Sequence, residues 1–447
     1  MSIDYLEKFF AIAFSLLILL NGFVIAKIAR TWFTPSGIIS IFWFAYTFFP
    51  LAMVFNAPVN ALSVLYISLA IFFFTLSSYA LNWRAAFILN QSKLQSALYL
   101  EFHTRFLRYS FYAIQYFSIF VVFLDIYAQG FSINDIVFNL METSSRYISL
   151  RYAEELNNSF LSRIGTVAIY VGVILGGLVF SAANTVFKKS IILFVALVPS
   201  LLIMVVQGAK GTLLLCVMFF YSTFLIYKLY VNDISLTDKK TNKNLFIIAV
   251  LLLPALISSF LSRGLYGYDL ELIVERLLSY IASYAFAHVY AFSDFFSFYI
   301  GDPYTLFYAP LSDHYYGFYT FMSIFKAFGS QIEVPLGTFD EYYNYNDFLK
   351  TNVFTLFRGL ILDFGLLGGL IFMFFLGAIA NLSFYNLLCS RRAYFSIAFF
   401  AIMFGFYYTC FISIFIWNSI FVAFFIFAML LIINRKIFVF RHNHSAE

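Results

Sequence analysis

The chain has 447 residues, of which 63% are hydrophobic and 11% are charged. Soluble globular domains do not have this composition, and repeated apolar runs of bilayer-spanning length indicate a polytopic helical membrane protein. The formal net charge of +5 does not indicate a nucleic-acid partner, because the basic residues gather in short connections between apolar runs. The three cysteines, Cys216, Cys389 and Cys410, lie inside apolar runs, which predicts neither a disulfide nor a cysteine metal site.

Apolar runs of about the 20 residues that a spanning helix needs follow one another through the chain. The residues before the first run, Asp4, Glu7 and Lys8, do not form the basic segment of a signal peptide, so this run is interpreted as a retained span. We therefore expect an all-α polytopic integral membrane protein with about eleven transmembrane helices. They are expected over Phe9–Ala26, Ile38–Phe55, Leu62–Leu81, Phe106–Tyr127, Ile164–Phe187, Ser190–Gln207, Thr212–Tyr230, Leu245–Leu261, Phe354–Leu376, Tyr394–Phe415 and Ser419–Ile433.

Basic residues recur in every second connection, and the side rich in Lys and Arg is the cytoplasmic one. Of the alternate short connections, 56–61 has no charge and 208–211 holds only Lys210. The pattern places the N-terminus outside, the C-terminus in the cytoplasm and the segment 263–352 outside. The residues that set it are Lys27, Arg30, Arg84, Lys93, Arg105, Arg108, Lys188, Lys189, Lys239, Lys240, Lys243, Arg391, Arg392, Arg435, Lys436 and Arg441.

This orientation is testable with reporter fusions at Lys240 and Ser330. Because the two positions are separated by one expected span, the reporters should report opposite sides of the membrane. Reporters active on the same side at both positions would contradict the orientation.

The chain divides into three parts. Residues 1–262 hold the first eight expected spans and a smaller outer loop over 128–163, and residues 353–447 hold the last spans. Between them lies a long outer segment, 263–352, which is rich in Gly, Tyr, Asn and acidic residues. Long loops that serve only as connections are uncommon, so this segment and its two junctions with the spans are the expected functional region.

Three cations and one acid stand at outer span ends. Lys210 lies in a glycine turn, Gln207-Gly-Ala-Lys-Gly-Thr212, where the backbone can approach a phosphate; a lysine that extends from a short loop toward water is the alternative. Arg263 ends a span against the charge bias, which contact with lipid headgroups would also explain. Arg358 and Asp363 lie close to the hydrocarbon or just inside it, where ionisable residues are costly and usually functional.

The outer segments hold further candidates. His288 and His314 are candidate bases, although a lone histidine in an apolar stretch is more often a core residue. Arg146 and Arg151 would lie near one another on a helix, which a solvated surface helix would equally explain. The aromatic and acidic residues Tyr315, Tyr316, Asp340, Glu341, Tyr342 and Tyr343 combine ring faces with hydrogen-bond acceptors, as sugar binding requires; membrane-interface tyrosines are the alternative.

Two of these stretches carry a resemblance. The segment Asn352-Val-Phe-Thr-Leu-Phe-Arg-Gly-Leu-Ile-Leu-Asp-Phe-Gly-Leu-Leu-Gly resembles the late motif of the Wzy-type O-antigen polymerases, the oligosaccharide repeat-unit polymerase family. In that family a Thr precedes an Asp-Phe-Gly at the start of a span after a long periplasmic loop. The Gly-Ala-Lys-Gly turn is similar to the family's Gly-Ser/Ala-Arg-Gly turn, with Lys210 in place of the usual arginine.

The resemblance implies a glycosyltransferase on the periplasmic face of the bacterial inner membrane, with the N-terminus periplasmic. Such an enzyme transfers an undecaprenyl-pyrophosphate-linked glycan onto a hydroxyl of a second lipid-linked repeat unit, building O-antigen or a related polysaccharide. We expect Lys210, Arg263 and Arg358 to face pyrophosphate, with Asp363 orienting Arg358. His288, His314 and the acids of 340–347 stand as candidate bases. Neither a metal nor another cofactor is expected, and membrane lipids and a chain-length regulator are the further partners.

Other functions compete with this interpretation. A lipid-linked glycan flippase or transporter should have repeats and charges that line a cavity at the middle of the membrane, whereas the charges here lie mostly at span ends. A metal-dependent phosphosugar transferase would usually place acidic residues in its first outer loop, and 56–61 has none. An O-antigen ligase differs only in its acceptor and remains open.

Overall fold

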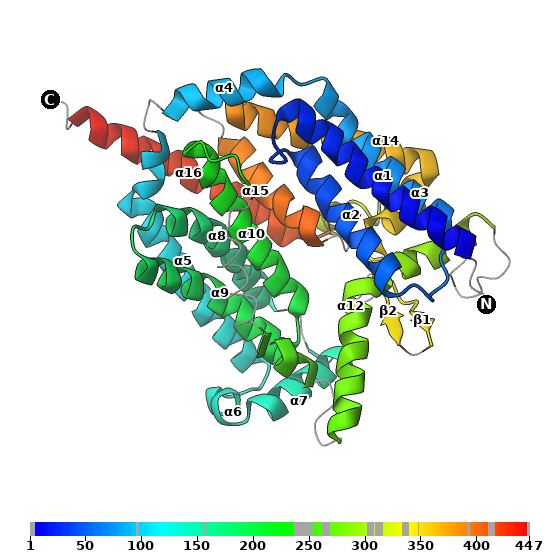
Figure 1. Ribbon diagram of the computed structural model, residues 1–447. Helices are drawn as coiled ribbons and strands as arrows, with labels where there is room; N and C mark the ends of the chain where they lie inside the picture. The colour runs from blue at the N-terminus through cyan, green and yellow to red at the C-terminus, as the bar shows by residue number, and fades with distance from the viewer. Residues whose placement is uncertain are drawn as a thin grey trace. The chain divides into compact units, whose positions relative to one another are not determined.

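The computed structural model describes residues 5–94, 98–153, 155–156, 159–236, 253–254, 256–261, 269–301, 308, 316–332, 339–346, 348–390, 394–409 and 416–444. Within these ranges the chain is an all-α polytopic membrane protein, with ten helices long and apolar enough to cross a bilayer (Figure 1). The single sheet of the described ranges is one short antiparallel hairpin.

The elements follow one another in the order α1 (Tyr5–Ala29), α2 (Pro35–Met53), α3 (Ala61–Tyr79), α4 (Trp83–Leu94), the 3-10 helix η1 (Leu98–His103), α5 (Arg105–Ala128), α6 (Ile133–Phe138), α7 (Leu140–Tyr152), α8 (Phe160–Ala182), α9 (Val186–Gln207), α10 (Lys210–Tyr230), α12 (Leu270–Tyr299), α13 (Met322–Ala327), β1 (Tyr343–Tyr345), β2 (Leu349–Thr351), α14 (Thr355–Cys389), α15 (Tyr394–Thr409) and α16 (Asn418–His444).

Most expected spans coincide with helices. The expected spans from Phe9–Ala26 to Thr212–Tyr230 are α1, α2, α3, α5, α8, α9 and α10, and the last three are α14, α15 and α16. The turn expected at Trp417-Asn418 is confirmed, because α16 begins at Asn418. About half of the expected span Leu245–Leu261 falls outside the described residues, and its last residues, 256–261, are helical.

The long segment differs from the expected loop, because it contains the 30-residue helix α12. This helix is apolar enough over part of its length to qualify as a span by composition. Its second half buries a run of apolar and small polar residues, including Ala287, Val289, Phe292 and Phe295. The residues that flank α12 have a composition typical of loops, so the whole segment was interpreted as a loop. The apolar face of α12 packs on protein, as in an amphipathic helix.

The chain forms two compact units. Unit 1 comprises residues 1–84, 274–385 and 409–418, and unit 2 comprises residues 85–273, 386–408 and 419–447. In unit 1, α1 packs along both α2 and α3. In unit 2, α8 packs along α5, α10 and α9.

One end of unit 1 joins the long segment to the connection between α2 and α3. Asn60 caps α3 with its side chain, and its backbone N–H donates to Ser293 of α12 at 2.7 Å. The hairpin reaches the same connection, since the Tyr345 hydroxyl donates to the Asn56 carbonyl at 2.8 Å. The buried Lys8 ammonium, at the start of α1, donates to the Ala57 carbonyl at 2.6 Å and to the Tyr290 hydroxyl at 3.1 Å. We call this end the Asn60 end.

The opposite end of unit 1 is held by α14. The Asn381 side chain accepts a hydrogen bond from Ser36 at 3.0 Å and donates one to Ser77 at 3.0 Å. Trp83 packs its ring on Phe384 there. Helix α14 therefore runs from the Asn60 end, where its first residues lie, along the bundle to the opposite end.

A kink at Gly365 divides α14 into two pieces. Gly365 has φ 70° and ψ −179°, a backbone conformation open essentially to glycine alone. The 35 residues of α14 would extend about 52 Å as one helix, well beyond the roughly 30 Å of the hydrocarbon core. The piece after the kink, 366–389, extends about 36 Å and can span by itself. Arg358 and Asp363 lie in the short piece before the kink, not in the straight helix.

Candidate functional site

Arg358 lies buried in an enclosure of aromatic rings at the Asn60 end of unit 1. Its side chain belongs to the short first piece of α14, and the residue is 4% exposed. The centre of its guanidinium lies 3.8 Å from the ring centroid of Phe339 and 4.2 Å from that of Phe354. The rings of Phe295 and Tyr308 are 4.9 and 5.1 Å away. Contacts of this kind stabilise a cation electrostatically, most strongly where water is excluded.

The carboxylate that pairs with Arg358 is Glu341, not Asp363. Arg358 Nη2 donates to Glu341 Oε2 at 2.9 Å, and the Glu341 side chain is 21% exposed. The guanidinium atoms Nε and Nη1 are buried and have no hydrogen-bond partner among the described residues. A buried donor without a partner is costly, which makes these two atoms candidate donors to the acceptor oxygens of a ligand.

Asp363 has a different partner, and its expected role of orienting Arg358 is wrong. Its two carboxylate oxygens accept from the backbone N–H groups of Tyr319 at 3.1 Å and Thr320 at 2.6 Å. Residues five apart on a helix point roughly 140° away from each other, so the two side chains diverge. Asp363 instead fastens the turn of the long segment to the first piece of α14.

Two further polar residues complete the surroundings of Arg358. The Tyr308 hydroxyl donates to Asp294 Oδ2 of α12 at 2.6 Å. Burial and the neighbouring Asp294 carboxylate raise the pKa of Tyr308 above its usual value, so its hydroxyl keeps its proton. We define the Arg358 cluster as Arg358, Glu341, Asp294 and Tyr308 with the rings of Phe295, Phe339 and Phe354.

Sequence reasoning missed Asp294 and Tyr308. Asp294 left a usable signal, because it is the only acid in the apolar run Ala287–Phe298. Tyr308 left none, since tyrosines are frequent throughout the long segment.

Thr355 adds backbone strain to the start of α14. It has φ 64°, which is a rare conformation for a β-branched residue. Its hydroxyl is buried without a hydrogen-bond partner among the described residues. Strain of this kind is typical of functional sites, and Thr355 begins the helix three residues before Arg358.

The glycine turn lies in unit 2 between α9 and α10. Gly208 ends α9 with φ 67°, and a side chain there would also meet Ile148 of α7. The Lys210 ammonium donates to the Ser259 carbonyl at 3.1 Å and lies 4.1 Å from the centroid of the Phe260 ring. Lys210 therefore stands at the expected turn, half-buried.

Helix α7 covers this turn with one face. Ser144 donates to the Val205 carbonyl at 2.6 Å, and Arg151 donates to the Gln207 carbonyl at 3.2 Å. Arg146 points elsewhere and lies over the Phe131 ring at 5.7 Å. The expected helix is confirmed, but the two arginines do not converge, because their spacing of five places them on different faces.

The expected sugar-binding residues are divided between surface and core. Tyr316 and Tyr342 are 79% and 56% exposed, and Asp340 is exposed as well. Tyr343 is instead buried, and burial raises the pKa of its phenol. Exposed rings and acids therefore remain along 340–342, while Tyr343 belongs to the packing of the hairpin.

His288 is a core residue. It is 1% exposed, its Nε2 donates to the Tyr46 carbonyl at 2.7 Å, and its ring stacks on Tyr46 with centroids 3.5 Å apart. A base must reach the proton that it removes, so this arrangement excludes His288 as the expected base. His314, Tyr315 and Arg263 lie outside the described residues.

Comparisons with known proteins add no relative. No protein-family model, no curated protein and no solved structure matches the chain.

Proposed function

We propose that this chain polymerises undecaprenyl-pyrophosphate-linked oligosaccharide repeat units into a surface polysaccharide on the periplasmic face of a bacterial inner membrane. The observation that carries the proposal is the buried Arg358, whose Nε and Nη1 lack partners among the described residues. A pyrophosphate supplies the acceptor oxygens that these donors need. Arg358 also stands in the segment that resembles the late motif of the Wzy-type polymerases.

The contacts at the Asn60 end support the outward placement of the Arg358 cluster. Asn60 and Asn56 belong to the uncharged connection that the charge pattern places outside, and both touch the long segment. If α12 crossed the membrane, Arg391 and Arg392 would change sides and the alternation of basic connections would break. We therefore place α12 on the outer surface, with α14 entering the membrane after Gly365.

In the proposed reaction a hydroxyl of the acceptor glycan attacks the anomeric carbon of the donor. The new glycosidic C–O bond forms while the bond from that carbon to the pyrophosphate oxygen breaks. The pyrophosphate leaves on the lipid with the electron pair, and the hydroxyl proton passes to a base. Arg358 stabilises the charge that develops on the leaving group, and Glu341 and the rings hold its guanidinium in place.

The position of buried charges favours an enzyme over a transporter. Lys8 lies in the first turn of α1, Asp125 near the end of α5, and Lys228 near the end of α10. Arg358 and Asp363 lie before the kink of α14. A transporter keeps its ionisable residues near the middle of the membrane, around its substrate.

The test of the proposed function is deletion of the gene in its host, with the surface polysaccharide examined on a gel. A polymerase deletion should remove the ladder of long chains and retain single repeat units. Loss of all repeat units, the single ones included, would indicate a flippase or a ligase and would contradict the proposal.

Lys210 should contribute through its charge at the glycine turn. Lys210→Arg should keep the ladder, because it preserves the cation, while Lys210→Ala should lose most long chains. Lys188→Ala is the matched control, since it removes an exposed lysine from the other end of α9. A normal ladder from Lys210→Ala would show that the Ser259 and Phe260 contacts serve packing alone.

A further inference from the structure

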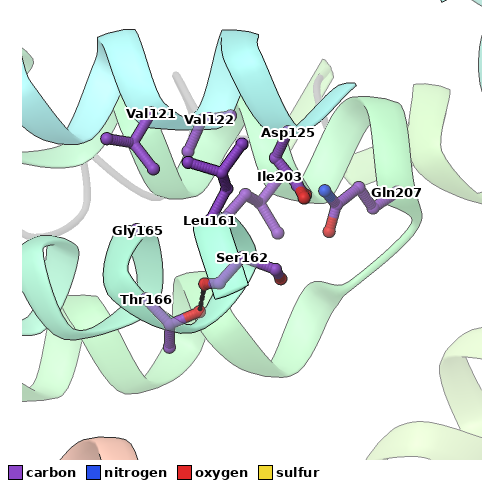
Figure 2. Close-up of a pocket in the computed structure, with 9 residues that line it drawn as sticks. All are labelled: Val121, Val122, Asp125, Leu161, Ser162, Gly165, Thr166, Ile203 and Gln207. Carbon is purple, nitrogen blue, oxygen red and sulfur yellow. Dashed lines mark hydrogen bonds between the residues drawn. The ribbon is translucent and has the colours of Figure 1, made fainter. Parts of the chain in front are cut away.

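A small pocket opens in unit 2 where α5 ends, α8 begins and α9 ends. Its lining residues come from these three helices and are shown in Figure 2: Val121, Val122, Asp125, Leu161, Ser162, Gly165, Thr166, Ile203 and Gln207. The accessible volume of the pocket is about 10 Å³, which is room for about one water molecule. The pocket therefore suits a single hydroxyl-sized group of a larger ligand.

The polar groups of the pocket have unused hydrogen-bonding capacity. Asp125 is 4% exposed, and its Oδ1 accepts from the Ser159 hydroxyl at 2.5 Å. Its Oδ2 has no hydrogen-bond partner among the described residues, and neither has the side-chain amide of Gln207. Figure 2 shows these two side chains facing one another. A carboxylate oxygen and an amide offer one strong acceptor, one weaker acceptor and two donors at one place.

The remaining walls are apolar. Val121, Val122, Leu161 and Ile203 line the pocket beside the polar groups. A sugar ring presents C–H surface and hydroxyl groups together, and each hydroxyl both donates and accepts a hydrogen bond. The mixture of apolar walls with a carboxylate and an amide matches this chemistry better than it matches an anion, which the Asp125 carboxylate would repel.

Two cations contact or belong to the turn that Gln207 opens. The backbone carbonyl of Gln207, whose side chain lines the pocket, accepts a hydrogen bond from Arg151. Lys210 begins α10 three residues further along the same turn. A sugar that inserts one hydroxyl beside the Gln207 side chain would therefore carry its linked phosphate toward the turn that Arg151 contacts.

We propose that this pocket binds one hydroxyl group of a sugar that is linked to a phosphate, with Asp125 and Gln207 as the recognising residues. The inference rests on the proposed function, and it names a site within unit 2 that recognises the sugar of the lipid-linked substrate. Asp125 acts as a hydrogen-bond acceptor for a sugar hydroxyl, in addition to its contact with Ser159.

The test uses the purified full chain with Cys216, Cys389 and Cys410 replaced by alanine and Ser162→Cys added. The Ser162 hydroxyl makes no hydrogen bond within the described residues, so cysteine preserves the local contacts. The rate of modification by a water-soluble methanethiosulfonate reports access to the pocket. Ser145→Cys, exposed on α7, is the matched control for labelling outside the pocket.

Three probes are compared: the lipid-linked repeat unit extracted from the host, the free oligosaccharide, and undecaprenyl pyrophosphate without sugar. The lipid-linked unit should protect Ser162→Cys and leave Ser145→Cys unprotected. The free oligosaccharide should need a concentration at least about tenfold higher, because the phosphate contacts are lost. Undecaprenyl pyrophosphate should not protect. Absence of protection by the lipid-linked unit, or equal protection by either of the other probes, would overturn the proposal.

The Asp125→Asn variant separates the role of Asp125 in sugar recognition from its contact with Ser159 at the start of α8. It keeps an oxygen for Ser159 but loses the charged acceptor, so half-protection should need about tenfold more lipid-linked unit. Ser159→Ala removes the contact with Asp125 together with the α8 cap, in which the Ser159 hydroxyl accepts from the Ser162 backbone N–H, and it should leave protection nearly unchanged. Equal weakening by both variants would show that Asp125 serves α8 alone. Protection of Ser162→Cys without any polymerisation would contradict the proposed function but support the sugar site. Polymerisation without protection would support the proposed function but contradict the sugar site.

Discussion

Replacing Arg358 by alanine is expected to abolish long polysaccharide chains. A cation that stabilises a leaving pyrophosphate contributes on the order of 3 kcal/mol to the transition state, which is about a hundredfold in rate. Arg358→Lys should recover only part of this loss, because lysine lacks the planar fork whose Nε and Nη1 remain available in the cluster. The gel ladder of surface polysaccharide measures the effect.

The alanine variant also disturbs the fold, so a second variant is needed. Removing one member of a buried ion pair is strongly destabilising, whereas replacing both members by neutral side chains of similar volume is often tolerated. We therefore expect Arg358→Met combined with Glu341→Gln to fold like the parent, with a methionine among the rings of Phe339 and Phe354. Thermal unfolding in detergent measures folding. A normal ladder from this folded double variant would restrict Arg358 to a packing role.

Replacing Gly365 by alanine should damage the site without a steric clash. The nearest atom to an added Cβ is the Tyr299 hydroxyl at 3.8 Å, which is ordinary contact. The strain comes from φ 70° and ψ −179°, and a side chain in such a conformation costs about 1–3 kcal/mol. Relief of the strain would straighten α14 and move Arg358 and Asp363 away from Glu341 and the Tyr319 turn. We expect a lower unfolding temperature and loss of long chains.

Gly211→Ala is the control for this change. Gly211 is helical, with no neighbour within 4 Å of an added Cβ, and its φ is ordinary. Alanine favours helix over glycine, so Gly211→Ala should leave stability unchanged or raise it slightly. Equal stability of the Gly365→Ala and Gly211→Ala variants would contradict the claim that the kink of α14 requires glycine at position 365.

The spans could be predicted because hydropathy and basic connections are local properties of the chain. Helices α1, α2 and α3 coincide with their expected runs, and the expected turn at Trp417 is present. Helix α12 was not predicted, since the segments that flank it are rich in glycine, proline, tyrosine and acidic residues that are typical of loops. Its packing against Asn60 and Tyr46 depends on contacts more than 200 residues apart in sequence, which no local pattern contains.

The candidate site was predictable in position but not in pairing. Arg358 and Asp363 could be identified as candidates because a charge near the membrane is costly, and this inference required no knowledge of their partners. No local pattern could identify Glu341 as the partner of Arg358, because Glu341 precedes the hairpin in sequence and Arg358 follows it. Nor could such a pattern show that Asp363 binds the backbone of Tyr319 and Thr320, because backbone donors carry no sequence signature. His288 was a candidate base because the sequence does not show whether a histidine is buried. The structure shows that it is.

Reconstitution of the purified chain in lipid vesicles with the extracted lipid-linked repeat unit tests the central claim most directly. We expect products longer than one repeat unit, with one undecaprenyl pyrophosphate released for each new glycosidic bond. The folded Arg358→Met, Glu341→Gln double variant should form none. If the parent chain is folded in the vesicles and every repeat unit remains single, with no release of undecaprenyl pyrophosphate, the chain is not the polymerase.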